Sequence, residues 1–350
     1  MKKNKKKNLP STLREMEIFA KKKSKKGPFN WLNAAAENGI TKKINEEVFQ
    51  KVEIVPNFFN DTASLDTSVN IFGNRLSMPL VISPMGHQTQ FHNNGEAELA
   101  EGTKSEKILL CFSTQGRMPL SKIKKKFPNG KFIWDFFPFG PKKWIKEQIV
   151  EAKKNGAIAV TMTIDAPVRS VRYLDRESRY DARKYGKFFK PMPPDISYGR
   201  KLKVEDLKWM KEYCGKLPFI IKGILSTNDA NLAIENGADV IWVSNHGGRM
   251  LESCYSSLKA LVEIKKDTKK KTPIFFDSGI RTGSDIIKAI GLGANVVGIG
   301  RPSIYALIVA GKKGVEHMLA LFREELETAM INSGLTCIND ISKKNIKLNF

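Results

Sequence analysis

Cysteine is scarce in this sequence, and its spacing excludes several small-domain architectures. The four cysteines of the 350-residue chain lie far apart, at Cys111, Cys214, Cys254 and Cys337, and no CxxC or CxxxC pair occurs. This excludes a zinc ribbon, an iron–sulfur cluster of familiar spacing and a small domain stapled by disulfides. We therefore predict no metal site.

Long uncharged hydrophobic runs are also absent. No stretch approaches the ~20 apolar residues that a membrane-spanning helix requires. The lysine-rich start lacks the apolar region of a secretory signal. Hydrophobic residues still make up 41% of the chain, enough for a sizeable core. We expect a soluble, cytoplasmic protein.

Acidic residues are few compared with basic ones, 36 against 59, which gives a net charge of +23. Residues 1–26 contribute +9 of this and the other 324 residues contribute +14. Charge spread in this way indicates a lysine-rich surface, and we predict no specific nucleic-acid partner. The basic residues 21–26 suit weak attachment to an anionic membrane, so the expected location is cytoplasmic and peripheral to a membrane.

Short apolar runs recur along the chain from residue 79 onward. Stretches of helical spacing separate them, for example residues 144–155, 228–236 and 283–292, and each of these ends close to a glycine. A helix that ends at glycine before a continuous apolar strand is the repeating unit of a parallel sheet covered on both faces. The eight predicted strands are residues 79–84, 108–113, 132–137, 157–165, 219–224, 240–246, 273–279 and 295–300.

The number of repeats distinguishes two α/β folds. Eight β/α units in about 230 residues match the size of a (β/α)8 TIM barrel. A doubly wound sheet normally has fewer strands, and the Gly-x-Gly-x-x-Gly turn of a dinucleotide site does not follow Pro84. We predict a (β/α)8 barrel over residues 79–332, an N-terminal helical and extended segment over 1–78 that packs on it, and a C-terminal tail over 333–350.

Polar side chains gather at the carboxyl ends of the predicted strands, where a (β/α)8 barrel builds its active site. Each alone is ordinary, because a single lysine or histidine is usually a surface or core residue. On successive strands they converge on one rim. They are Ser83, Ser113, Thr163, Asp165, Lys222, Ser244, His246, Asp277 and Arg301.

Glycines end the last two predicted strands, in FFDSGIR (275–281) and GIGRP (298–302). Glycine leaves backbone N–H groups unhindered, and the segment at Pro302 can open a helix. This is the phosphate site of many barrels, with Arg281 and Arg301 as its cations. The alternative is two tight turns with surface arginines.

The sequence SNHGGR (244–249) offers acid–base chemistry beside an anion site. Gly247 and Gly248 give the backbone the freedom to direct His246 and Arg249 to one cavity. A guanidinium can hold a substrate carboxylate while an imidazole takes a proton. Asp165 can orient the imidazole and stabilise its charged form.

From about residue 28 to residue 332 the sequence resembles the FMN-dependent α-hydroxy-acid oxidase and dehydrogenase family, which includes glycolate oxidase, lactate oxidase and mandelate dehydrogenase. The resemblance rests on WVSNHGGR, FFDSGIRTGSDIIKAIGLGANVVGIGRP, FIIKGI and TMTIDAP followed by Arg172. It implies a barrel that holds non-covalent FMN at its C-terminal mouth, in a homo-oligomer that is often a tetramer.

The resemblance also implies roles for particular residues. His246 matches the catalytic base and Asp165 its carboxylate partner, while Arg172 and Arg249 match the arginines that hold the substrate carboxylate. Lys222 matches the cation that stabilises the reduced flavin. The matched cofactor contacts are Ser83, Pro84, Gly86, Ser113, Trp134, Thr163, Lys222, Ser244, Asp277, Gly279, Arg281, Gly300 and Arg301.

Three positions depart from the family pattern. Trp31 stands where a tyrosine is usual, and WDF supplies Trp134 and Phe136 where Gln-x-Tyr is usual after the third strand. We expect Trp31 and Phe136 to contact the substrate and to favour a large, apolar acid. Gly86 resembles the dehydrogenase-type members and leaves room for a larger side chain.

These observations predict an FMN enzyme that oxidises an L-2-hydroxy acid to the 2-oxo acid. The electron acceptor would be O2 or a quinone or cytochrome. Two alternatives remain. One is a divergent FMN barrel with a substrate that is not a hydroxy acid, or a weakly active flavin-binding protein. The other is a non-catalytic basic protein that keeps the flavin barrel but binds anions or nucleic acid.

Overall fold

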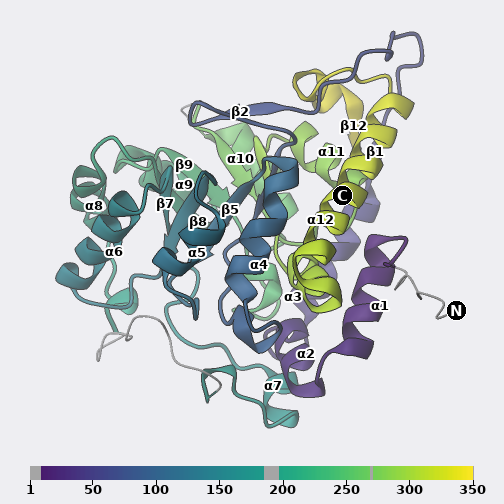
Figure 1. The fold of residues 1–350 in the computed structure, drawn as a ribbon. Coiled ribbons are helices and arrows are strands. Elements are labelled where there is room, and N and C mark those ends of the chain that lie inside the picture. The colour runs from purple at the N-terminus through teal and green to yellow at the C-terminus, as the bar shows by residue number, and fades with distance from the viewer. Residues whose placement is uncertain (1–8, 185–196, 269–270, 350) are drawn as a thin grey trace, which may run out of the picture.

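The computed structural model describes residues 9–184, 197–268 and 271–349. Eight parallel strands close into a barrel in the order β10-β11-β4-β5-β6-β7-β8-β9 (Figure 1). All eight predicted strands are present, which confirms the (β/α)8 barrel. The strands are β4 Leu80–Ile82, β5 Leu109–Ser113, β6 Phe132–Phe136, β7 Ala159–Thr163, β8 Phe219–Ile224, β9 Val240–Val243, β10 Ile274–Phe276 and β11 Val296–Ile299.

Each strand buries both faces, which explains the continuous apolar runs. One buried cluster fills the barrel interior and includes Ile133, Trp242 and Phe275. A larger cluster packs the outer strand faces against the helices and includes Trp134 and Phe136. Because side chains alternate along a strand, neighbours in β6 face opposite layers.

Helices surround the strands and end where the glycines predict. Gly156, Gly237 and Gly293 have left-handed φ values of 72°, 104° and 117°, which glycine adopts at no steric cost. The helices that cover the barrel are α4 Gly95–Gly102, α5 Leu120–Lys126, α6 Lys142–Lys154, α8 Asp206–Cys214, α9 Thr227–Glu235, α10 Ser257–Asp267, α11 Gly283–Gly291 and α12 Arg301–Asn332; α7, Tyr173–Glu177, lies in the loop after β7.

The N-terminal segment is helical and packs on the barrel. Helix α1 (Leu13–Lys23) lies along α12, and α2 (Lys26–Asn33) and α3 (Ile40–Glu47) follow it beneath the strand ends (Figure 1). Strand β1 (Val52–Ile54) pairs with β12 (Ile346–Leu348), and β2 (Val69–Ile71) pairs with β3 (Asn74–Leu76) in a hairpin. The first strand pair joins the N-terminal segment to the C-terminal tail. The domain boundaries remain a prediction.

Short 3-10 turns complete the chain. They are η1 Val48–Lys51, η2 Gln88–Gln90, η3 Thr103–Glu106, η4 Ala182–Lys184, η5 Ser197–Arg200, η6 His246–Gly248, η7 Ile338–Asp340 and η8 Lys343–Asn345. Within the described ranges, no helix is both long and apolar enough to cross a bilayer.

Candidate active site

A cavity of about 470 Å³ opens at the carboxyl ends of the barrel strands. Asp165 and Ser244 lie behind its wall, where they bind His246 and Lys222. Trp134 and Phe136 do not line the cavity. The sequence-predicted residues that line the cavity are Trp31, Ser83, Pro84, Gly86, Ser113, Thr163, Arg172, Lys222, His246, Arg249, Asp277, Gly279, Arg281, Gly300 and Arg301.

His246 and Asp165 form a hydrogen-bonded pair at this wall. Nδ1 of His246 lies 2.9 Å from Oδ1 of Asp165. The backbone of His246 is left-handed, with φ of 58°, and strain of this kind in a non-glycine residue is concentrated at functional sites. Because Asp165 occupies Nδ1, the second ring nitrogen, Nε2, is left for a substrate in the cavity.

Gly223 makes room for Asp165. Its φ is 104°, and a Cβ atom there would lie only 2.6 Å from the Cβ of Asp165. The pairing of β8 with β9 shifts register between Lys222 and Ile224, next to this glycine. Irregularities of this kind re-aim side chains near active sites. The FIIKGI sequence therefore places Lys222 and Asp165 together.

Lys222 forms a buried ion pair on the cavity floor. Its Nζ lies 2.6 Å from Oγ of Ser244 and 2.9 Å from Oδ2 of Asp277. Burial alone lowers the pKa of Lys222, but Asp277 and Asp165 together hold that pKa above its ordinary value. Burial raises the pKa of Asp277, but Lys222 and Ser244 lower it by more. The net pKa of Asp277 is therefore below its ordinary value, and the pair is ionised. The cavity floor thus carries a fixed cation.

Arg249 brings a buried positive charge to the cavity. Its Nη1 donates to the carbonyl oxygens of Trp31, Leu32 and Ala34 at 3.0, 2.9 and 2.7 Å. The guanidinium carbon lies 5.0 Å from the centre of a Trp31 ring. Burial, followed by the charge of two neighbouring arginines, lowers the pKa of Arg249 well below its ordinary value. Positive charge this crowded favours an anionic ligand.

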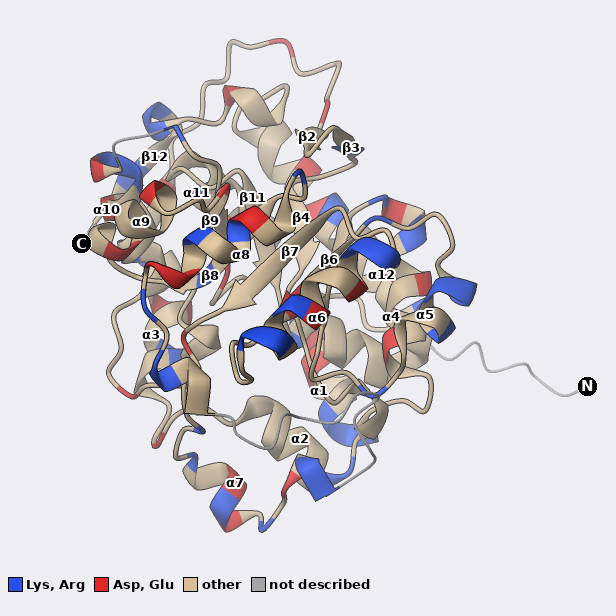
Figure 2. Cartoon of the chain, turned by 90° about the vertical axis from the view of Figure 1, so that its left-hand side faces the viewer, with Lys and Arg blue, Asp and Glu red and all other residues tan. Residues whose placement is uncertain are grey.

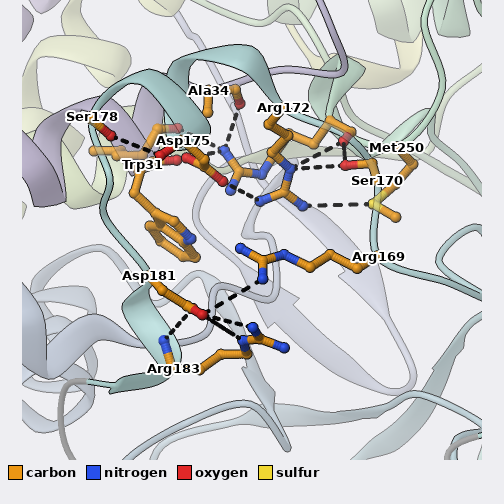
Figure 3. A network of polar contacts seen from close by, with 12 residues as sticks. Trp31, Ala34, Arg169, Ser170, Arg172, Asp175, Ser178, Asp181, Arg183 and Met250 are labelled. Atoms are coloured by element: carbon orange, nitrogen blue, oxygen red, sulfur yellow. Dashed lines mark hydrogen bonds and ion pairs between the residues drawn. The ribbon is translucent and has the colours of Figure 1, made fainter.

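Arg172 contacts the main chain of Arg249 in the same wall, and Figure 3 shows Arg172 close to Ser170 and Asp175. Its Nε donates to Oγ of Ser170 at 2.9 Å and to the carbonyl of Arg249 at 3.3 Å. Its Nη1 lies 3.6 Å from Oδ2 of Asp175, which is longer than a hydrogen bond. Two guanidinium groups from separate loops can therefore approach one carboxylate.

Glycine and arginine form the other end of the cavity. Gly279 has φ of 104°, and a Cβ atom there would lie 2.1 Å from the carbonyl oxygen of Asn45. Gly300 directly precedes α12, whose first N–H groups have no partner within the helix. Nη2 of Arg281 lies 2.7 Å from Oε1 of Glu46. A helix start with a neighbouring arginine suits a phosphate.

Arg301 was predicted to be a cation of the phosphate site, but in the structure its guanidinium binds the main chain. Its guanidinium donates to the carbonyl oxygens of Gly247 at 3.0 Å and Leu32 at 3.1 Å. Burial lowers its pKa to about 10. Lys42 adds a nearby cation that the sequence did not single out, since burial and then Arg301 lower its pKa to about 8. The positive charge at this end is therefore larger than predicted.

The donor groups of the cavity fit FMN. Hydroxyl groups of Ser113 and Thr163 and the ammonium of Lys222 lie on the strand ends, where they suit the hydrogen-bonding edge of a flavin ring. The glycine turns and Arg281 suit the phosphate. The cofactor would thus extend across the barrel mouth.

Two predicted contacts are wrong. Trp134 and Phe136 are buried, with exposed fractions of 1% and 0%, in the outer layer of the core and do not line the cavity. Alternation along β6 directs Asp135 inward instead, and Phe137, just after the strand, lines the cavity. Phe137 is therefore the aromatic residue that this part of the chain contributes to the cavity.

The space beside Gly86 also differs from the expectation. A Cβ atom at Gly86 would lie 2.6 Å from the Cβ of Gln115. The missing side chain therefore accommodates Gln115 and opens no extra room for substrate.

Several cavity residues escaped the sequence analysis. The ring of His87 packs edge-on to Trp31 at 5.3 Å, and its Nδ1 lies 2.9 Å from Nη2 of Arg117. Burial, followed by the charges of Arg117 and Arg249, lowers the pKa of His87 to about 3, so it is neutral near pH 7. No sequence pattern marked it. Other additions include Met85, Phe139, Arg169, Asp181 and Arg183.

Comparison with known proteins assigns a family. The sequence model of FMN-dependent dehydrogenases matches residues 20–348. A 2-hydroxyacid oxidase from Dictyostelium discoideum is 33% identical over 342 residues, which cover 94% of this chain and 88% of the relative. Glycolate oxidase 3 from Oryza sativa subsp. indica is 29% identical over 355 residues, with coverage of 97% and 96%.

A solved structure agrees over the same length. A soluble mutant of the membrane-associated (S)-mandelate dehydrogenase from Pseudomonas putida gives a TM-score of 0.90 at 27% identity, and covers 97% of this chain and 100% of that one. These matches confirm the resemblance seen in the sequence and its cofactor, FMN. The chain belongs to the FMN-dependent dehydrogenase family.

Proposed function

We propose that this protein oxidises an (S)-2-hydroxy acid to the 2-oxo acid. The observation that carries the proposal is the His246–Asp165 pair at the wall of a cavity that Arg172 and Arg249 also line. An acid–base group beside two guanidinium groups suits a substrate with a hydroxyl next to a carboxylate. The relatives named 2-hydroxyacid oxidase and glycolate oxidase support the same chemistry.

The reaction removes one hydrogen from C2 of the substrate and one from its hydroxyl group, and a C=O bond forms. Two electrons and two protons leave the substrate. FMN, held by the strand-end hydroxyl groups, Lys222 and the glycine and arginine end of the cavity, would supply the two-electron oxidant and take up one of the two protons. Nε2 of His246 takes the other proton, and the carboxylate of Asp165 stabilises the resulting imidazolium. Arg172 and Arg249 bind the carboxylate and so fix C2 near the base.

Lys222 supports the reaction from the cavity floor. Its ammonium is held by Asp277 and Ser244, so its position is fixed before substrate binds. A fixed cation would stabilise the negative charge of a reduced flavin bound next to it. This role does not require Lys222 to exchange a proton.

Anaerobic reduction of the purified holoprotein tests the proposal. A panel of (S)-2-hydroxy acids with short, branched, aromatic and acidic side chains is added, and the flavin absorbance is followed. At least one acid should bleach the flavin, and its (R) enantiomer serves as the control. If no acid in the panel bleaches the flavin, the proposal is wrong and a divergent FMN barrel with another substrate is favoured.

The electron acceptor, the assembly and the membrane are separate parts of the proposal. Fast return of colour on admission of air would identify O2 as the acceptor, and a slow return would favour a quinone or cytochrome. Light scattering tests for a homotetramer. Exposed Lys21 and Lys22 lie in the last turn of α1, and Lys26 begins α2 (Figure 2). Salt-sensitive pelleting with anionic liposomes tests peripheral attachment there.

A further inference from the structure

The cavity holds more positive charge than one carboxylate requires. Arg169 and Arg183 line it together with Arg172 and Arg249. The guanidinium of Arg169 lies between the Arg172 group and the pair formed by Asp181 and Arg183 (Figure 3). Arg169 also lowers the pKa of Arg172, after the effect of burial and against the attraction of Asp175. Arg169 is thus a further cation close to Arg172.

Asp181 does not neutralise Arg169, because its carboxylate is bound to Arg183. Nε of Arg183 donates to Oδ1 of Asp181 at 3.0 Å, and Nη2 donates to Oδ2 at 2.6 Å. This bidentate pairing, with the backbone N–H of Arg183, holds the pKa of Asp181 well below its ordinary range. Nη1 of Arg169 lies 3.6 Å from Oδ2, beyond hydrogen-bond length.

Arg169 therefore retains donors for a ligand. Over the described residues, its contact with Asp181 is the only ion pair or hydrogen bond found for its side chain. The side chain is about half exposed, at 47%, and reaches the cavity from the loop after β7. A guanidinium carries five N–H donors in a fixed fork that matches a carboxylate. The group of Arg169, Asp181 and Arg183 has a net charge of +1, which one carboxylate balances.

We propose that the preferred substrate is a 2-hydroxy dicarboxylic acid, whose second carboxylate binds Arg169 at the cavity mouth. This inference rests on the proposed function, because Arg172 and Arg249 then hold the carboxylate beside the hydroxyl. The 2-hydroxy dicarboxylate loses two electrons and two protons and becomes the 2-oxo dicarboxylate. Bound FMN would supply the two-electron oxidant, as in the proposed function, and the distal carboxylate is unchanged.

Matched pairs of acids test the inference in the holoprotein. (S)-Malate, (S)-2-hydroxyglutarate and (S)-2-hydroxyadipate are compared with the (S)-2-hydroxy monoacids of equal carbon number. The anaerobic rate of flavin reduction and the dissociation constant are measured for each. For at least one chain length, we expect the dicarboxylate to have a tenfold or greater advantage in kcat/KM.

Substitution of Arg169 should remove this advantage. R169Q is expected to raise the dissociation constant of the preferred dicarboxylate at least tenfold and to leave the paired monoacid within twofold, because only the distal carboxylate loses a charge-assisted hydrogen bond. R183Q should also reduce the preference, since it frees Asp181 to pair with Arg169. Arg176, exposed on α7 and outside the cavity, provides the matched control R176Q, which should change neither value.

Three results would overturn the inference. If monoacids reduce the flavin as well as dicarboxylates do at every length, the inference is wrong but the proposed function stands. If R169Q weakens both members of a pair equally, Arg169 acts on the shared carboxylate and not on a distal one. If neither dicarboxylates nor their matched monoacids reduce the flavin, the inference is wrong, and the wider panel of branched and aromatic 2-hydroxy acids decides whether the proposed function stands. FMN content and circular dichroism of each variant show that a loss does not reflect misfolding.

Discussion

Asp135 should make the stability of this protein depend on pH in a way that D135N removes. Its side chain is fully buried beneath the cavity, where Thr163 donates to Oδ1 at 2.6 Å. Over the described residues, Oδ2 has no hydrogen-bond partner. Burial raises the pKa of Asp135 from 3.8 to about 7, although Thr163 and Lys222 act in the opposite direction.

The raised pKa of Asp135 sets the magnitude and the sign of the pH dependence of folding stability. A raised carboxyl pKa means that the folded protein binds the proton more tightly than the unfolded chain does. The associated stability is complete below about pH 4 and is lost as pH rises through about 7. At about 1.4 kcal/mol per pKa unit, the total is about 4 kcal/mol. Asn is isosteric and does not titrate, so D135N should gain about 3 kcal/mol relative to wild type between pH 5 and pH 8.

Urea unfolding of both proteins with saturating FMN, at four pH values from 5 to 8, measures this difference. Other titrating groups cancel between the two proteins. D66N is the matched control: Asp66 is exposed, and hydrogen bonds from Ser68 lower its pKa, so it stays ionised throughout this range. Stability curves for wild type and D135N that run parallel from pH 5 to pH 8 would refute a neutralising buried carboxyl at this position.

Further substitutions address the site. H246A should retain FMN and lose about 10²–10⁴ in the rate of flavin reduction, measured by stopped flow, because the base is gone; H317A, whose ring bonds to Pro10 away from the cavity, should react normally. G223A should displace Asp165 and slow reduction at least tenfold, while normal rates would show that the close contact is relieved cheaply. F137Y should tighten substrate binding severalfold by adding a hydroxyl beside His246, whose ring lies 6.2 Å away, whereas F136Y, in the outer core, should not. R249K should weaken substrate binding, since lysine lacks the bidentate fork, and an unchanged dissociation constant would remove Arg249 from carboxylate binding.

The barrel was predictable because its strands are buried on both faces and its helices end at glycine. The same double burial explains the error at Trp134 and Phe136. Every position of β6 is buried, and four of its five residues are apolar, so the strand shows no regular apolar and polar alternation to indicate which side chains face inward. The structure resolves this by directing Asp135 into the barrel.

Other site residues depend on tertiary approach. His87 and Arg169 lie in loops without a repeating pattern, and their position beside Trp31 and Arg172 follows from how separate loops meet. By contrast, His246 and Lys222 could be placed from the sequence, because strand ends of a barrel share one rim.

The carbonyl groups that end α2 connect the beginning of the chain to its chemistry. Arg249 and Arg301 both donate to the oxygen of Leu32, and Trp31 forms part of the cavity wall. An anion that draws either guanidinium toward itself must therefore compete with the main chain of residues 31–34. Binding of an anion at the barrel mouth and packing of this early segment are therefore thermodynamically linked. A change in one should change the stability of the other.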